Sequence, residues 1–321
     1  MLNVFFTIDV EISCNGWQNS DAIFANVFDR YIHGNTPQGQ FGLPYQLKVL
    51  NDHGLTSVCF IEALFSACFG QQPLNEIVSL VCEAGHEVQL HMHPEWVSQA
   101  RTPLLENMQG NRPNMRDYSL AEQTSLIASG MQMLKRAGAP DINAFRAGSF
   151  GFNRDTLEAL AANGIAYDSS YNLTMFGPTS GVKTGESVWW PFECANVYEY
   201  PMTVFDDGTG KLRHVQLTAC SFSEFEKLLW GALEAGYSSF VILSHSFELL
   251  NGSKRDRSDP VAINRFRKLC AFMEKNRDVF CVRGFQGLAA ENTAAPLPVL
   301  CTPLWQTGRR IIEQVYRRRY G

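Results

Sequence analysis

Short apolar runs alternate with amphipathic stretches along most of the chain. Runs of strand length are typical of buried strands, and apolar residues that recur every three or four positions are typical of amphipathic helices. The pattern predicts strands over residues 2–8, 56–62, 86–91, 142–146, 165–167, 238–245 and 278–284. It predicts helices over residues 43–54, 73–85, 119–138, 154–163, 223–236 and 261–275. Strands that alternate with helices favour a parallel sheet, and this number of units suits an α/β barrel.

Two helix starts carry a further signal. Ser119 and Glu122 fit the S-x-x-E pattern, in which each side chain bonds to the backbone NH group of the other residue. Ser223 and Glu226 fit the same pattern. These pairs predict where two of the helices begin.

The chain changes character near residue 290. The sequence there reads NTAAPLPV, which is typical of a boundary, and residues 304–321 read LWQTGRRIIEQVYRRRYG, which predicts a short basic amphipathic helix. We therefore expect a barrel domain over residues 1–290 and an extension over residues 291–321. Two interpretations of the helix are open: it packs on the barrel with its basic face in solvent, or it contacts a membrane surface or a partner.

Composition narrows the class of protein. The net charge of −5 argues against a general nucleic-acid binder, because neutralising phosphates requires a basic surface. The nine cysteines form no C-x-x-C pair, which favours reduced thiols over a disulfide framework or a cysteine-rich zinc site. The N-terminus lacks the features of a secretory signal, and no apolar run is long enough to span a membrane. We expect a cytoplasmic protein.

Two histidines stand one residue apart at the end of a predicted strand. In EAGHEVQLHMHPEW, His91 and His93 share one strand face because side chains alternate along a strand. Asp9 and Glu11 share a face at the end of the first predicted strand in the same way. Two imidazoles and a carboxylate with open positions form a catalytic zinc-type ligand set. The alternative is a chance H-x-H pair, and His86, at the start of the same strand, is too distant to join it.

Three later strand ends also carry polar residues. Arg146 follows INAF, Asp168 follows IAY, and His245 ends the apolar run VILS. The carboxyl ends of parallel strands are where sites form in such folds, so these side chains are candidates to join the first two groups. Each has an ordinary alternative: a surface ion pair for Arg146, a loop cap for Asp168 and a buried core histidine for His245.

The order of these residues resembles the five motifs of the polysaccharide deacetylase family, carbohydrate esterases with the NodB-homology fold. The matching segments are TIDVE (7–11), GHEVQLHMHP (85–94), RAGSF (146–150), DSSY (168–171) and LSH (243–245). The resemblance covers roughly residues 1 to 290. It implies an α/β fold built as a distorted (β/α) barrel of about seven strands.

The resemblance also implies a bound divalent metal ion, with zinc first and nickel, cobalt or iron as alternatives. Val10 stands where the family usually has its metal-binding aspartate, so Glu11 takes that role. His91 and His93 are the histidine ligands, although the family spacing of H-x-x-x-H-P is compressed here to H-x-H-P. Glu95 is the alternative third ligand.

The remaining roles follow from the same motifs. Asp9 matches the catalytic base and Arg146 the arginine that pairs with it. His245 matches the general acid, and Asp168 the aspartate that orients it. Gly148 stands where the third motif has its proline, which puts the shape of that loop in question.

The implied activity is metal-dependent hydrolysis of an N-acetyl group on a sugar or glycan precursor. With the expected location, the substrate would be a soluble, nucleotide-linked or lipid-linked sugar in surface-polysaccharide assembly, such as O-antigen or capsule. A hydrolase of cyclic amides such as allantoin, on the same fold, is one alternative. A sugar-binding module without catalysis is another.

Overall fold

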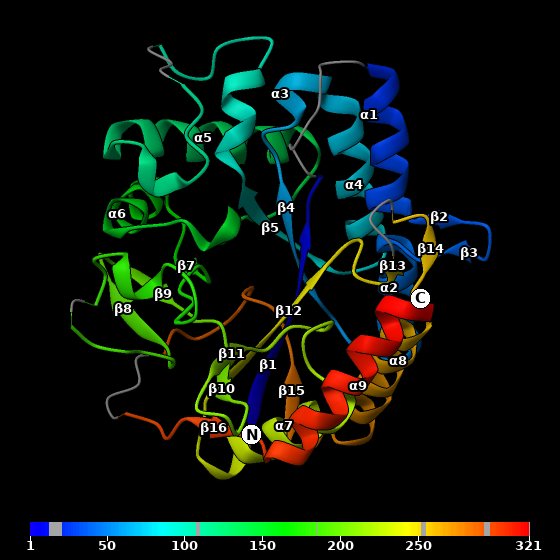
Figure 1. The fold of residues 1–321 in the computed structure, drawn as a ribbon. Helices are drawn as coiled ribbons and strands as arrows, with labels where there is room; N and C mark the ends of the chain where they lie inside the picture. Colours follow the sequence, from blue (N-terminus) through cyan, green and yellow to red (C-terminus); the bar gives the residue numbers. More distant parts are fainter. Residues whose placement is uncertain (13–20, 107–109, 184, 252–254, 292–295, 321) are drawn as a thin grey trace.

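The computed structural model describes residues 1–12, 21–106, 110–183, 185–251, 255–291 and 296–320, with the backbone alone for residues 21–22 and 318–320. A curled, nine-stranded sheet lies at the centre of these residues, with helices on its outside (Figure 1). Its strands are β1 (Leu2–Val10), β4 (Val58–Glu62), β5 (Glu87–Met92), β6 (Ala144–Ala147), β7 (Tyr167–Asp168), β8 (Phe192–Cys194), β9 (Val197–Glu199), β12 (Ser239–His245) and β15 (Phe280–Val282). The order is β12-β1-β4-β5-β6-β7-β9-β8, and β15 pairs with the start of β1. Only the pair β8–β9 is antiparallel.

The helices follow the strands in a βα alternation. They are α1 (Asp21–Phe28), α2 (Leu43–Asp52), α3 (Ser66–Phe69), α4 (Gln71–Glu83), α5 (Leu120–Arg136), α6 (Arg154–Ala162), α7 (Phe222–Glu234), α8 (Pro260–Lys275) and α9 (Leu304–Tyr320). Short strands outside the main sheet are β2 (Asn35–Thr36), β3 (Gly39–Gln40), β10 (Val204–Asp206), β11 (Leu212–His214), β13 (Leu250–Asn251), β14 (Arg257–Ser258) and β16 (Leu300–Cys301). Each predicted strand and helix has a counterpart, so the prediction of a distorted α/β barrel is confirmed.

The two-residue period of the strands separates an inner from an outer layer. On β1, Val4, Phe6 and Ile8 pack against the helices, while Phe5 belongs to a separate inner cluster. That inner cluster also holds Phe60 of β4 and residues of β6, β7 and β12. The inward-pointing side chains in the first part of these strands are therefore apolar. The last inward-pointing residues of the strands lie above this inner apolar cluster.

The sheet curls through about half a barrel, and an irregular segment fills the space between β7 and β12. Residues 200–203 and 215–217, on either side of the β10–β11 hairpin, run along this gap, and Thr203, Val215 and Leu217 bond to β12. Leu243 donates its backbone NH to Val215 and accepts from Leu217, at 3.0 and 2.8 Å. The hydroxyl of Thr203 accepts from the NH of Val241 at 2.8 Å. Side-chain and backbone bonds thus take the place of a regular strand.

One of the two predicted helix caps is correct and the other is wrong. Ser119 and Glu122 form the capping box of α5 as predicted. Helix α7, however, begins two residues earlier than predicted, with Ser221 and Glu224 as its capping box. The sequence SFSEFE offers two overlapping S-x-x-E frames. Glu224 is fully buried and pairs with an arginine of α9, and this distant contact favours the earlier frame.

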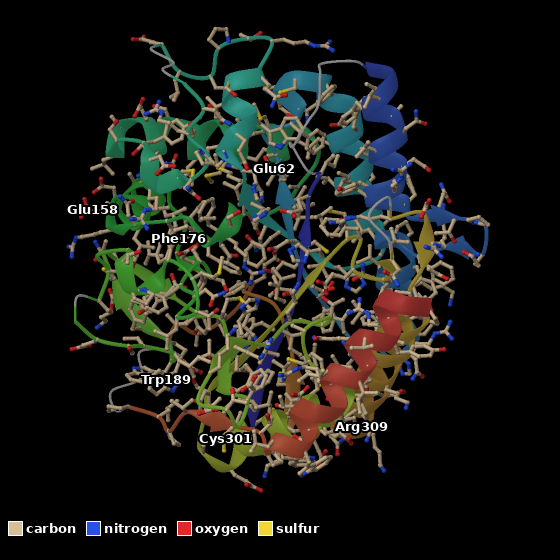
Figure 2. The ribbon with its side chains drawn as sticks, viewed as in Figure 1. Glu62, Glu158, Phe176, Trp189, Cys301 and Arg309 are labelled. Atoms are coloured by element: carbon tan, nitrogen blue, oxygen red, sulfur yellow. The ribbon has the colours of Figure 1, made fainter. Side chains whose placement is uncertain are left out.

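Helix α9 lies on the outside of α7 and α8 (Figure 1). Its polar contacts with the barrel place its polar side inward. Arg310 is 1% exposed and bonds to Glu224 and Asp207 at 2.5 and 3.0 Å. Arg317 bonds at 2.6 Å to Asp259, the residue that caps the start of α8. The expectation of a packed helix with its basic face in solvent is therefore only partly correct. Arg310 and Arg317 turn towards carboxylates on the barrel, whereas Arg309, labelled in Figure 2, is 62% exposed.

Within the residues described, no helix has the length and apolar character needed to cross a membrane. The division of the chain into a barrel domain (1–290) and an extension (291–321) stays a prediction.

We expect Arg310→Met to lower the free energy of unfolding by about 3 kcal/mol or more, because it removes the charge that balances two buried carboxylates. Arg309→Met, at the exposed neighbouring position, should change it by less than about 0.5 kcal/mol. Urea unfolding followed by circular dichroism measures both. Equal effects would show that the inward arginine does not anchor the helix.

Candidate metal centre and active site

The residues singled out at the strand ends meet at one end of the barrel. Asp9 of β1 lies beside His245 of β12 in the strand register, and His91 of β5 lies beside Arg146 of β6. All four side chains are on the inward-facing side of the sheet, above the inner apolar cluster. Glu11 lies one residue beyond the end of β1.

Glu11, His91 and His93 form a compact cluster of potential metal ligands. Oε2 of Glu11 lies 2.6 Å from Nε2 of His93 and 3.2 Å from Nε2 of His91. The three donor atoms all lie within 4.8 Å of one another. Ligand atoms around a tetrahedral zinc ion lie about 3.3 Å apart, so the cluster has the size that one ion requires.

In both histidines, the ring nitrogen that does not face Glu11, Nδ1, contacts an oxygen atom of a neighbouring residue. Nδ1 of His91 donates to the backbone carbonyl of Arg146 at 2.8 Å. Nδ1 of His93 lies 3.1 Å from Oε2 of Glu95. Such partners fix the ring and leave Nε2 as the coordinating atom, an arrangement typical of metal-binding histidines. Glu95 therefore lies behind His93 rather than beside Glu11.

This donor set fits a divalent transition-metal ion. Two neutral imidazoles and one carboxylate match the catalytic zinc pattern and leave positions for water and substrate. Burial alone would raise the pKa of Glu11, but its contacts with both histidines outweigh burial and keep this pKa well below its ordinary range. A carboxylate that stays ionised when buried is suited to bind a cation.

The compressed H-x-H spacing and the glycine in the third motif are structurally coupled. A Cβ atom on Gly148 would lie 2.6 Å from the ring of His93. Any other residue at position 148 would therefore push this ring away from Glu11. The backbone NH of His93 is also bonded to the buried carboxylate of Glu62, at the end of β4. Two neighbouring strands thus fix where the second histidine lies.

Arg146 and Asp9 form a buried ion pair beside the cluster. Nη1 of Arg146 donates to Oδ1 of Asp9 at 2.6 Å and to the hydroxyl of Thr7 at 2.9 Å. Nε and Nη2 donate to the carbonyl and hydroxyl oxygens of Ser169, each at 3.1 Å. The guanidinium group also lies 4.3 Å from the ring centre of Phe60. Among the described residues, no hydrogen bond occupies Oδ2 of Asp9.

The residue that orients His245 is Glu248. Its Oε1 lies 3.3 Å from Nδ1 of His245, and it also accepts from the hydroxyl of Thr218 at 2.8 Å. Burial lowers the pKa of His245, but the hydrogen bond to Glu248 and the nearby acidic groups outweigh burial and raise it to about 9. His245 is therefore protonated at neutral pH.

The expectation that Asp168 orients His245 is wrong. Asp168 is fully buried, accepts from the hydroxyl of Ser170 at 2.6 Å and shares a hydrogen bond with Glu199 of β9. Burial and the neighbouring Asp168 raise the pKa of Glu199 well above its ordinary value, which favours a proton shared between the two carboxyl groups. This carboxyl pair joins β7 to β9 and supports the loop that bonds to Arg146.

A stack of three side chains borders the His245 side of the site. The ring of Phe247 lies 5.2 Å from that of His245, at an interplanar angle of 20°. The guanidinium group of Arg255 lies 3.3 Å from the centre of the Phe247 ring. The sequence analysis missed this stack and Glu248. Only the short spacing of Glu248 from His245 could have suggested its role.

Comparisons with known proteins bear on the fold. No protein-family model and no curated protein matches the sequence. Among solved structures, a protein described as a polysaccharide deacetylase from Mycobacterium smegmatis matches with a TM-score of 0.54 and 18% identity, over 92% of this chain and 94% of the other. This chain has the polysaccharide deacetylase fold. A 4-α-glucanotransferase from Thermococcus litoralis matches with a TM-score of 0.50 and 10% identity, over 93% of this chain and 40% of the other.

In this polysaccharide deacetylase fold, direct contacts join the five motif segments. Glu11 of the first contacts both histidines of the second, and Asp9 of the first contacts Arg146 of the third. Arg146 bonds to Ser169 of the fourth, and His245 of the fifth lies beside Asp9 in the sheet. The segments that resemble the family motifs therefore form one site.

We expect the purified protein to bind a divalent metal ion through this cluster. His91→Ala should abolish binding, because it removes a ligand held on both sides. Gly148→Ala should weaken it about 10- to 100-fold, since displacing a ligand resembles the loss of its supporting contact. Asp9→Asn should leave it unchanged. Elemental analysis and metal titration measure all three, and metal retained in His91→Ala would contradict the ligand assignment.

Glu248→Gln should lower the pKa of His245 from about 9 towards its ordinary value, because the hydrogen-bonding anion is lost. In metal-free protein, the imidazole would then lose its proton at lower pH, which NMR titration of labelled histidine detects. Asp168→Asn is the control and should leave this titration unchanged. A larger shift in the control than in Glu248→Gln would restore Asp168 as the orienting group.

Proposed function

We propose that this protein is a metal-dependent hydrolase that removes an N-acetyl group from a sugar or glycan precursor. The observation that carries the proposal is that one buried carboxylate, Asp9, lies close to three functional groups. Asp9 is paired with Arg146, lies one strand away from a protonated His245, and is two residues from the ligand cluster around Glu11. A base, an acid and a cation site at one strand end suit hydrolysis of an amide.

Glu11, His91 and His93 would hold the divalent cation, with zinc as our first choice of metal. When bound, such an ion supplies a Lewis acid that polarises a carbonyl group and lowers the pKa of water. The cluster contributes one negative charge and two neutral donors, which leaves a net positive site for an oxyanion.

Asp9 would act as the general base. Its Oδ1 accepts a hydrogen bond from Arg146, which fixes the plane of the carboxylate. Its Oδ2 is the atom available to accept a proton. Because Arg146 is itself fully buried and held by Ser169 and Thr7, the base cannot rotate without breaking several contacts.

His245 would act as the general acid for the leaving amine. It is protonated at neutral pH and 20% exposed, so its ring can reach a bound substrate. Glu248, held by Thr218, fixes the ring and keeps the proton on it. A positioned acid of this kind typically contributes about 10²- to 10⁴-fold to the rate.

The identity of the sugar and its carrier stays a prediction from the sequence. We propose a nucleotide-linked, lipid-linked or free precursor used in the cytoplasm for surface polysaccharides such as O-antigen or capsule.

The test is acetate release from a panel of N-acetylated sugars, nucleotide sugars and oligosaccharides, with allantoin as the competing substrate. We expect turnover on an N-acetylated sugar that a chelator abolishes and added zinc restores. His245→Ala and Asp9→Asn should each lose about 10²-fold or more while retaining metal. Hydrolysis of allantoin alone would favour a cyclic-amide hydrolase. Metal-loaded protein that binds sugars without turnover would overturn the proposal.

A further inference from the structure

The outer face of helix α9 is apolar, although this face is the one exposed to solvent. The exposed side chains on it are Leu304, Trp305, Ile311, Ile312, Val315 and Tyr316, each exposed by 52–71%. Twelve large apolar side chains are exposed among the described residues, and these six are half of them. A surface helix normally directs its apolar stripe towards the core, so α9 has the reverse orientation.

The inward face of α9 explains this orientation and makes it stable. Gln306, Thr307 and Arg310 are buried against α7 and the β10 region, where each of them donates at least one hydrogen bond to a partner on the barrel. Arg265 of α8 reaches Glu313 at 2.8 Å in the same interface. Rotating the helix to bury its apolar face would leave these charges unpaired, so the apolar side is held outwards.

The arrangement of residues around the helix resembles that of a membrane-surface helix. At 3.6 residues per turn, the six apolar side chains and Gly308 span an arc of roughly 140°, which also includes the position of Arg319 in the last turn of the helix. Trp305 and Tyr316 lie along one edge of this arc, and Arg309 lies next to them. Aromatic residues and arginine at the edge of an apolar face are typical of helices that lie in the headgroup region of a bilayer.

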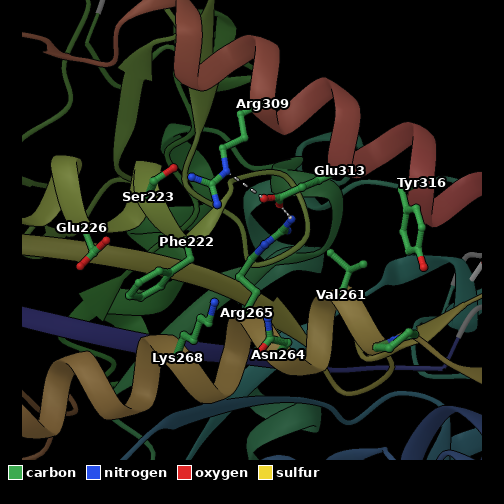
Figure 3. Close-up of a pocket in the computed structure, with 11 residues that line it drawn as sticks. Phe222, Ser223, Glu226, Val261, Asn264, Arg265, Lys268, Arg309, Glu313 and Tyr316 are labelled. Atoms are coloured by element: carbon green, nitrogen blue, oxygen red, sulfur yellow. Dashed lines mark hydrogen bonds and ion pairs between the residues drawn. The ribbon is translucent and has the colours of Figure 1, made fainter.

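The groove beside α9 adds positive charge at this edge (Figure 3). It has a volume of about 520 Å³ and lies between α7, α8 and α9. Its lining has three basic residues, Arg265, Lys268 and Arg309, and two acidic ones, Glu226 and Glu313. Glu313 is already paired with Arg265 and Arg309. The sequence of α9 holds five arginines and one glutamate, whereas the whole chain has a net charge of −5. By sequence, basic residues are therefore concentrated on this one helix, although Arg310 and Arg317 are paired with carboxylates of the barrel.

We propose that α9 docks this protein on an anionic membrane surface, with its apolar face in the headgroup layer and Arg309 and Lys268 against lipid phosphates. This goes beyond the proposed hydrolase activity and does not depend on it. A second copy of the chain fits this face less well than a membrane does, because the face is too small for a stable protein–protein interface. A helix of 17 residues is about 26 Å long and about 10 Å wide, so its outer face covers on the order of 300 Å², against about 800 Å² per partner in a stable interface.

The experiment is sedimentation of the full-length protein with vesicles of phosphatidylcholine alone or mixed with phosphatidylglycerol. We expect binding to the anionic vesicles that weakens as salt is added, and little binding to phosphatidylcholine. Ile312→Glu should lower the affinity about tenfold or more, because an apolar contact is lost. Arg309→Glu should lower it about fivefold or more, because each basic residue near the surface contributes to binding.

Matched controls separate docking from general effects. Ile23→Glu makes the same change at an exposed apolar position on α1, and Arg154→Glu makes it at an exposed arginine that pairs with Glu158 four residues on. Both should bind vesicles like the unchanged protein. Acetate release from a soluble substrate, metal content and urea unfolding should be the same in all four variants.

Several outcomes would overturn the proposal. They are equal vesicle binding in Ile312→Glu and the unchanged protein, no binding to anionic vesicles, and a dimer in light scattering that Ile312→Glu dissociates. Because hydrolysis is measured on a soluble substrate, a failure of docking with intact activity would leave the proposed function standing. Vesicle binding without any hydrolysis would support docking and remove the hydrolase.

Discussion

The buried ion pair between Arg146 and Asp9 is the interaction on which the rest of the site depends. Arg146 is fully buried, and a charge removed from water costs several kcal/mol unless partners replace its hydration. Those partners are Asp9 and Thr7 on β1, Ser169 after β7, and the ring face of Phe60 on β4. The guanidinium group therefore couples the register of four strands. A slip of one residue on β1 would move Asp9 to the outer face and leave the arginine without its counter-charge.

The same period of two residues determines which side chains can take part in chemistry. On β1, Phe5 belongs to the inner apolar cluster, Thr7 bonds to the arginine, and Asp9 lies at the mouth of the barrel. The inward-facing side chains of β1 thus become more polar towards the carboxyl end of the strand. The apolar layer beneath keeps water away from the lower side of Arg146, which strengthens its pairing with Asp9. On β12 the order is similar, since Leu243 lies in the apolar layer and His245 lies above it.

The sequence was sufficient to predict the longer helices and seven of the strands in the main sheet, because these follow from local periodicity, and order along the chain suggested the candidate ligands. It did not predict α1, α3, β8 or β9. It was insufficient where a distant contact decides between local alternatives. Asp168 and Glu248 are both acidic residues near a strand end, and only the packing shows that Glu248 reaches His245. Two overlapping capping patterns start α7, and a buried arginine from α9 favours the one at Ser221. The amphipathic pattern correctly predicted that α9 is a helix, but it could not show which face of the helix packs against the barrel.

The two departures from the family motifs, the H-x-H spacing and Gly148, are structurally linked. In this chain the second histidine of the pair stands only two residues after the first, so its ring approaches Glu11 from the side of β6. That approach requires a residue without a side chain at position 148, and glycine stands there. Glu62 and Glu95 then hold the backbone and the far ring nitrogen of His93, so the shorter spacing does not leave the ring loose. The position of the His93 ring therefore requires glycine at position 148. A ligand set that differs from the family pattern in sequence can therefore still close around one point in space.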